Sequence, residues 1–273
     1  MEKISITRDD LKQNILNEII LRIDYTGIIS IDGSLETFEK EFKSNFINYE
    51  TTFLNRIELG AIRIDEISEN LSIPVKELEK QLVHRFTKNT FGDDDVTFDI
   101  SKYFSVMHIN TKDYRSIDAY LKFFNNYIHF LKRENSFLSI KRFGIRKISS
   151  NIYSSIDELL HDFESKYFNV EFESRNFKKG GSQMVDLLTS EDELYNYNYK
   201  RLIEKGFKKE GDELKEAYQA LLDIDGYLTE QNIEKLNFLE NAEEIMIQFN
   251  DKLFDLFKLS MTNTFLTKNK KVN

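Results

Sequence analysis

The stretch Ser116–Ser149 reads SIDAYLKFFNNYIHFLKRENSFLSIKRFGIRKIS, and its apolar pattern changes from helical spacing to strand alternation. In the first part, one apolar stripe recurs at intervals of three and four residues: Ile117, Leu121, Phe124, Ile128 and Leu131. Four ring side chains widen that stripe: Tyr120, Phe123, Tyr127 and Phe130. We expect this helix in the core, because turning so wide a face to water would expose a large apolar patch. The last part, KRFGIRKIS, predicts a strand that follows the helix.

The sequence before this stretch predicts a strand, a helix and a hairpin. Glu18–Ile28 alternates apolar and polar residues, as a half-buried strand does. Behind a Ser34 cap, apolar residues again recur at helical spacing: Leu35, Phe38, Phe42 and Phe46. Further on, a helix is expected after Pro74, and QLVHRFTKN returns to strand composition. Gly92 and the run Asp93–Asp95 then predict a turn into a second strand, VTFDISKYFSVMHIN.

The sequence after this stretch predicts a helix capped by Ser155, an antiparallel strand meander over residues 169–229, and a helix over Asn241–Phe265. The order of elements predicts an α+β fold of mostly antiparallel sheets with packed helices, and two ferredoxin-like halves are one way to arrange them. No linker rich in Gly, Ser or Pro interrupts the chain. We therefore expect an N-terminal α+β half, residues 1–168, with a C-terminal meander and terminal helix, residues 169–273, packed on it.

The composition restricts the classes of function. The chain has 38 Lys plus Arg against 47 Asp plus Glu, a net charge of -9, which disfavours nucleic acid as a partner while leaving room for a local basic strip. The absence of Cys excludes a disulfide framework, a thiolate zinc site and a cysteine nucleophile. We expect a cytoplasmic protein without membrane association, since the start lacks a signal-peptide pattern and no apolar run approaches the ~20 residues that span a bilayer. A protein partner suits the acidic, aromatic-rich composition.

The strand KRFGIRKIS carries the first candidate binding site. Side chains alternate along a strand, so Arg142, Gly144 and Arg146 share one face while Phe143 and Ile145 point to the other. Two guanidinium groups would then flank a position without a side chain. This notch has room for a carboxylate, a phosphate or another backbone. The alternative is that both Arg residues pair with acidic residues on neighbouring strands.

The stretch LLDIDGYL carries the second candidate. Asp223 and Asp225 fall on one strand face, where paired carboxylates can hold Mg²⁺ or act as acid and base. Salt bridges to Arg142 and Arg146 are the alternative, and they would join both motifs in one network. We assign these five residues to binding: Arg142, Gly144, Arg146, Asp223 and Asp225.

The sequence indicates no catalytic residue, metal or cofactor. His129 and His161 lie on the polar sides of their predicted helices, while His84 and His108 lie on separate strands. A two-histidine metal site would need a strand register that the sequence does not supply. Neither a Gly-rich phosphate loop nor a GxSxG turn is present.

Several segments together resemble a known family. They are the EIILRIDY strand before a Phe-rich helix, RFGIRKIS after the long aromatic helix, the LDID strand, and a final helix ending FKLSMTNTF. The chain resembles a sporadically distributed family of uncharacterised bacterial proteins whose second landmark is close to Arg, apolar, Gly, apolar, Arg, Tyr, Ile, Asn. It departs from that pattern at Lys147 and Ser149. The resemblance carries no chemistry, but sporadic occurrence implies a mobile-element or phage-defence setting.

The function we expect is a non-enzymatic cytoplasmic binding or regulatory protein: an adaptor, antitoxin-like protein or target-recognition subunit of a bacterial defence or toxin–antitoxin-like system. The alternative is a nucleic-acid-processing or nucleotide-binding enzyme, with Arg142 and Arg146 on phosphate and Asp223 or Asp225 on a metal. Self-association or partner docking through the C-terminal helix is also expected, because Ile247, Phe254 and Phe265 add apolar surface outside its main stripe: Ala242, Ile245, Phe249, Leu253, Leu256 and Phe257.

Overall fold

The computed structural model describes residues 3–11, 15–28, 31–56, 79–111, 116–168 and 180–271. Its strands are β1 (Leu16–Thr26), β2 (Phe46–Arg56), β3 (Glu79–Asn89), β4 (Asp95–Ser101), β5 (Phe104–Asn110), β6 (Ser139–Tyr153), β7 (Gly181–Thr189), β8 (Asn196–Glu210) and β9 (Glu213–Thr229). Its α-helices are α1 (Ile31–Phe42), α2 (Asp118–Glu134), α3 (Ile156–Asp162), α4 (Glu230–Lys235), α5 (Phe238–Ser260) and α6 (Asn263–Lys268).

All described strands belong to one sheet of nine, in the order β2-β3-β4-β5-β1-β6-β9-β8-β7. Every neighbouring pair is antiparallel, so the expected α+β fold with antiparallel pairing is confirmed. Two ferredoxin-like halves are not confirmed, since the described strands form one sheet that continues from β1 through β6 to β9. The domain boundary at residue 168 remains a prediction, and the strand before it, β6, pairs with strands from both sides.

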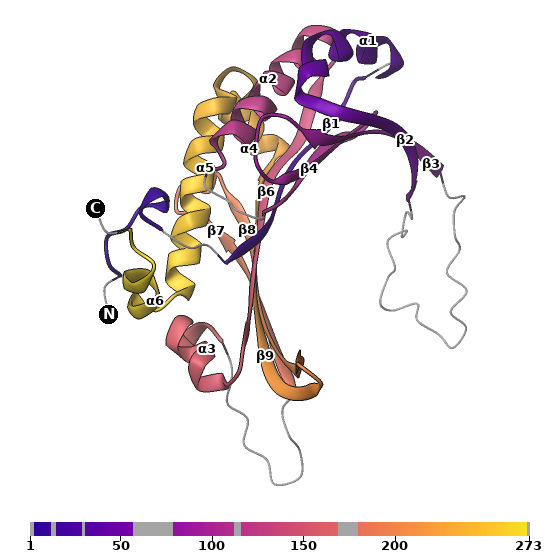
Figure 1. Ribbon diagram of the computed structural model, residues 1–273. Helices are drawn as coiled ribbons and strands as arrows, with labels where there is room; N and C mark the ends of the chain where they lie inside the picture. Colours follow the sequence, from indigo (N-terminus) through magenta and orange to yellow (C-terminus); the bar gives the residue numbers. More distant parts are fainter. Residues whose placement is uncertain are drawn as a thin grey trace, which may run out of the picture.

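The long helices α2 and α5, together with α1, lie on one face of the strongly twisted sheet (Figure 1). Strand alternation supplies the core beneath them, since Ile19, Leu21 and Ile23 of β1 all have 0% exposure. Helix α2 buries its widened stripe here as expected, and its Tyr127 hydroxyl hydrogen-bonds Ser105 at 2.6 Å. No helix in the described part of the chain is long and apolar enough to cross a membrane.

The chain order explains why the sheet is continuous. A first run leads from β1 through α1 and the antiparallel strands β2 to β5 into the long helix α2. A second run leads in the same way from β6 through α3 and β7 to β9 into α4 and the long helix α5. The opening strands of the two runs, β1 and β6, pair with each other at the centre, and α2 packs against α5. Each run thus supplies one side of the sheet and one long covering helix.

Four local expectations were wrong. Ser34 does not cap a helix, because α1 begins before it, at Ile31. The helical spacing does not continue to Phe46, because α1 ends at Phe42 and Phe46 begins β2, where its ring still packs against Phe98 at 6.0 Å. The stretch VTFDISKYFSVMHIN forms two strands, since the Ser101 hydroxyl accepts the backbone N–H of Phe104 and closes a turn. The terminal helix is two helices, α5 and α6, because the Thr262 side chain accepts the N–H of Phe265 and starts a new helix.

Two other expectations fall outside the described residues. They are the helix after Pro74 as far as Leu78, and the strand NVEFESRNF over residues 169–177. From Glu79 onward the expected helix is wrong, because these residues begin β3.

Candidate functional site

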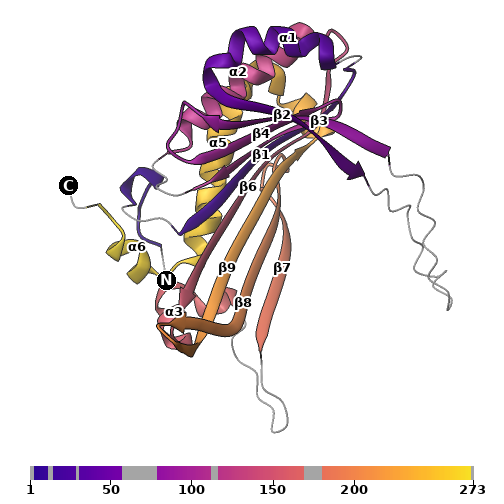
Figure 2. The ribbon, with the colours of Figure 1, turned by 45° about the vertical axis from the view of Figure 1, so that its right-hand side comes forward.

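The face of the sheet opposite the helices carries the residues that the sequence singled out. Figure 2 shows β9, β8 and β7 in front of α5, with no described helix covering them from this side. Phe143 and Ile145 have 0% exposure and face the helices. Arg142, Gly144 and Arg146 therefore lie on the opposite face of β6, which we call the open face.

The two Arg residues of β6 pair with the two Asp residues of β9. Arg146 donates from Nε and Nη2 to the two carboxylate oxygens of Asp223, at 2.7 and 2.6 Å. Arg142 donates from Nη2 to both oxygens of Asp225 at longer distances, 3.3 and 3.2 Å. The alternative in which salt bridges join both motifs is the arrangement observed. Whether this surface also binds a partner stays a prediction.

A third ion pair extends this set onto β1. Arg22 donates from Nε and Nη2 to Asp24 at 2.9 and 2.7 Å, and Arg142 Nη1 lies 4.0 Å from the same carboxylate. We call the six side chains the charge lattice: Arg22, Asp24, Arg142, Arg146, Asp223 and Asp225. The sequence reading missed the β1 pair, although alternation in EIILRIDY placed both residues on the polar face. The missing information was the register, which sets Arg22 opposite Gly144.

The space over Gly144 is taken by the chain itself. Arg142 lies opposite Thr229 in the sheet and leans along the strands, over the Tyr227 ring at 4.9 Å, to reach Asp225. A Cβ at position 144 would stand 3.3 Å from Arg142 Nη1 and 3.2 Å from the backbone oxygen of Gly226. Gly144 therefore lets Arg142 lie flat, and the notch that the sequence suggested holds the Arg142 guanidinium.

The lattice is partly open to water. Its Arg side chains are 44% (Arg22), 31% (Arg142) and 42% (Arg146) exposed, whereas Asp223 is 10% exposed. Hydrogen bonding to Asp223 raises the pKa of Arg146 above its ordinary value. The three carboxylates lie deeper than the three guanidinium groups.

We expect Arg146→Ala to lower the free energy of unfolding by about 1–2 kcal/mol, because it strips Asp223 of a two-bond partner. A fully buried pair would lose about 3–5 kcal/mol, but water can replace part of the bond where Arg146 is 42% exposed. A double-mutant cycle with Asp223→Ala in urea measures the coupling. The same cycle on the exposed pair Lys40 and Glu36, 3.9 Å apart, is the control. Equal coupling in the two cycles would show that the lattice is no stronger than an ordinary surface pair.

The other two cations of KRFGIRKIS, Lys141 and Lys147, lie outside the charge lattice. Lys141 pairs with Glu230, outside the lattice. Lys147 alternates to the helix-covered face, where its ammonium donates to the Asn250 side chain beneath α5. Burial lowers the pKa of Lys147 to about 7, and nearby Arg8 lowers it further while Asp251 opposes the shift. The four cations therefore do not form one basic strip.

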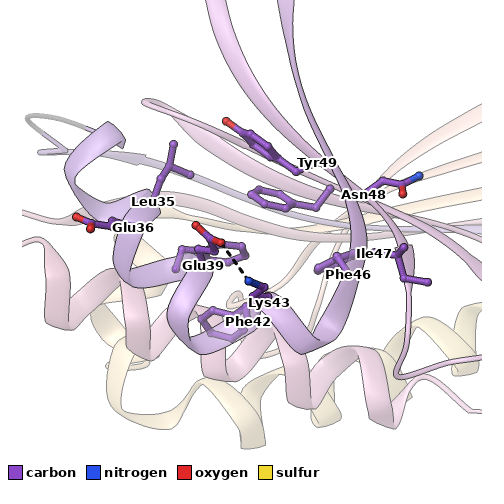
Figure 3. A pocket seen from close by; sticks show the side chains of 11 residues that line it. Leu35, Glu36, Glu39, Phe42, Lys43, Phe46, Ile47, Asn48 and Tyr49 are labelled. Carbon is purple, nitrogen blue, oxygen red and sulfur yellow. Dashed lines mark ion pairs between the residues drawn. The ribbon is translucent and has the colours of Figure 1, made fainter.

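A groove of about 470 Å³ lies between α1 and the sheet edge at β2 (Figure 3). Its floor consists of aromatic rings: Phe38, Phe42, Phe46, Tyr49 and Phe86. Glu39 and Lys43 of α1 form a 3.7 Å ion pair on its rim. The sequence reading missed this groove, because it placed Phe46 on the helix and did not identify β2.

The C-terminal helices expose two large apolar side chains, Ile247 and Leu259, at 42% and 39%. Phe265 is 4% exposed and Phe254 packs against the core. Self-association or partner docking through these helices stays a prediction.

In the described ranges, no group of three or more His, Asp or Glu residues lies close enough to hold a metal ion. His108 hydrogen-bonds Glu18 across β1 and β5 at 3.3 Å, and His84 hydrogen-bonds Tyr49 at 2.9 Å. His84 and His108, the pair considered for a two-histidine metal site, thus have different neighbours.

Comparisons with protein-family models, with curated proteins and with solved structures found no match for this chain.

Proposed function

We propose that this chain is a non-enzymatic binding protein that receives an acidic segment of a protein partner on its open face. It would act as an adaptor, antitoxin-like protein or target-recognition subunit of a bacterial defence or toxin–antitoxin-like locus. The locus rests only on the resemblance of Arg142–Ser149 and its companion segments to a sporadically distributed family. The binding role rests on the charge lattice.

The observation that carries the proposal is a row of oriented guanidinium groups on a sheet face that no described helix covers. Each is fixed by its own carboxylate, and the exposed fractions of 44%, 31% and 42% leave donors at the surface. Within the described ranges, Nη1 of Arg22 and Nη1 of Arg146 donate to no side chain. Pre-oriented guanidinium groups lose little side-chain entropy on binding and match carboxylates in paired hydrogen bonds.

The same contacts weigh against the enzyme alternative. Both oxygens of Asp223 accept from Arg146, and both oxygens of Asp225 accept from Arg142. A Mg²⁺ ion on either carboxylate would have to displace a guanidinium group, and the two cations would then repel each other. The lattice favours recognition over metal-dependent chemistry.

Calorimetric titration with Mg²⁺, alone and with a nucleoside triphosphate or single-stranded DNA, separates the two functions. We expect no saturable Mg²⁺ binding by the wild-type chain and no turnover of either substrate. Saturable binding that disappears in Asp223→Asn would assign the lattice to a metal site and refute the binding role. Asp186→Asn, a substitution at an Arg-paired carboxylate on β7 outside the lattice, is the matched control.

A further inference from the structure

Strand β2 is an edge strand that carries exposed apolar side chains. It forms the end of the sheet, with β3 as its only partner in the described part of the chain. Ile47, Tyr49 and Phe53 are 69%, 55% and 61% exposed. Natural edge strands usually carry charges or Pro that prevent further pairing. The strand Phe46–Arg56 has two charged residues, Glu50 and its last residue Arg56, and no Pro.

Because no further strand lies beside β2 among the described residues, its edge determines what kind of molecule can cover it. An extended chain can satisfy the outward N–H and C=O groups of β2 and bury its apolar side chains together. The groove beside α1 continues this surface, since Ile47, Asn48 and Tyr49 of β2 line it (Figure 3). The occupant must therefore be a strand with a large apolar side chain that enters the groove.

The sequence of β2 is complementary to itself. In an antiparallel pair of strands, residues that lie opposite each other point to the same face of the sheet. A two-fold axis perpendicular to the sheet therefore sets one residue of β2 opposite the same residue of the second copy. Placing Thr51 opposite Thr51 overlaps the whole strand Phe46–Arg56. It sets Tyr49 opposite Phe53 and Glu50 opposite Thr52, so no like charges meet. The register one residue earlier would set Glu50 against Glu50, which is destabilising.

In this register the groove receives an aromatic ring from the other chain. Tyr49 and Phe53 lie opposite Phe86 and Leu82 of β3 and so share the helix-covered side of the sheet. Phe53 of the second copy would stand beside Tyr49, at the mouth of the groove. Cross-strand aromatic pairs stabilise antiparallel strands, and the two-fold axis would form this pair twice.

We infer that the chain forms a homodimer by antiparallel pairing of β2 with β2 of a second copy, with each Phe53 covering the groove of the other. The two sheets become continuous, with both helix layers on one side and both open faces on the other. This inference is independent of the binding role of the charge lattice. If both hold, the dimer presents two lattices toward one side and can engage a bivalent partner.

Sedimentation velocity over a range of about 1–100 µM tests the dimer, because this range detects dissociation constants at the micromolar level. Salt at about 0.3 M screens the repulsion between two chains of net charge -9. We expect a species of twice the mass of one chain, and an increase of at least about 30-fold in the dissociation constant for Phe53→Glu. Phe207→Glu, the same change at a 73% exposed ring on β8, should leave the dimer intact.

The absence of Cys allows a direct test of the register. Residues opposite each other in antiparallel strands lie within disulfide range, so Thr51→Cys should give an intermolecular disulfide rapidly on mild oxidation. Thr189→Cys, at an exposed position on the other edge strand β7, should not. A wild-type chain that stays monomeric, an unchanged dimer in Phe53→Glu, or equal cross-linking of the two Cys variants would each overturn the inference.

Discussion

Replacing Phe124 by Asp is expected to unfold the protein or to lower its free energy of unfolding by at least about 4 kcal/mol. Phe124 has 0% exposure, and its ring lies among Phe98, Tyr127 and Phe143, with centroid distances of 6.1 to 6.3 Å. The substitution removes a buried ring, which alone is worth about 3–5 kcal/mol, and leaves a carboxyl group without a partner. The effect is large because α2 joins the first run of strands to the helix layer shared with α5.

Thermal and urea unfolding measure this loss. Phe137→Asp is the matched control, since Phe137 is 71% exposed and its replacement should shift the free energy by less than about 0.5 kcal/mol. Phe124→Leu keeps an apolar side chain and should lie between the two. A melting temperature of Phe124→Asp equal to that of the wild type would mean that α2 does not form the core described above.

Lys147 is expected to make the protein more stable as the pH rises from 7 to 9. Its side chain is only partly buried, but its ammonium ends at Asn250, which has 0% exposure. Burial lowers its pKa from 10.5 to about 7 in the folded protein. Between these values the unfolded chain binds a proton that the folded chain does not, so the free energy of unfolding increases with pH. The slope approaches at most about 1.4 kcal/mol per pH unit.

Urea unfolding at pH 7, 8 and 9 measures the slope in the wild type and in Lys147→Met. The substitution removes the titrating group, so its curve should be flat where the wild-type curve rises by roughly 2 kcal/mol or more. Loss of the hydrogen bond to Asn250 lowers the free energy of unfolding of the variant by the same amount at each pH. It therefore leaves the dependence of that free energy on pH unaffected. Deprotonation of the buried Tyr residues lies above this window, since burial raises the pKa of Tyr25 and Tyr127. Parallel curves would show that Lys147 titrates as an exposed lysine does.

The sequence predicted those parts of the fold that depend on periodicity over a long segment. Helix α2 and strand β6 lie where the stretch Ser116–Ser149 placed them. Over that length, apolar residues that repeat at helical spacing can be distinguished from apolar residues that alternate along a strand. The boundaries at Phe46 and Thr262 could not be predicted in the same way. At both places an apolar residue continues the helical spacing by coincidence, and a turn or a side-chain cap decides where the helix ends.

The candidate site was predictable by face but not by register. Alternation alone places Arg142 with Arg146, and Asp223 with Asp225, on the polar faces of their strands. Which strands are neighbours depends on contacts far apart in sequence, so the Arg22 and Asp24 pair could not be joined to them. Alternation also places Lys147 opposite the lattice, but only the α5 packing shows that Asn250 receives its ammonium.

Binding between this chain and the purified products of its neighbouring genes tests the central claim most directly. Biolayer interferometry would compare the wild type with Arg22→Glu, which reverses an exposed lattice charge, and with Arg133→Glu on α2, where Arg133 is 53% exposed. We expect one product to bind the wild type and Arg133→Glu alike, and to bind Arg22→Glu at least about tenfold more weakly. Arg22→Glu should remain folded at the assay temperature, although its Asp24 loses a partner. Equal binding by all three chains, or no binding by any product, would contradict recognition through the open face.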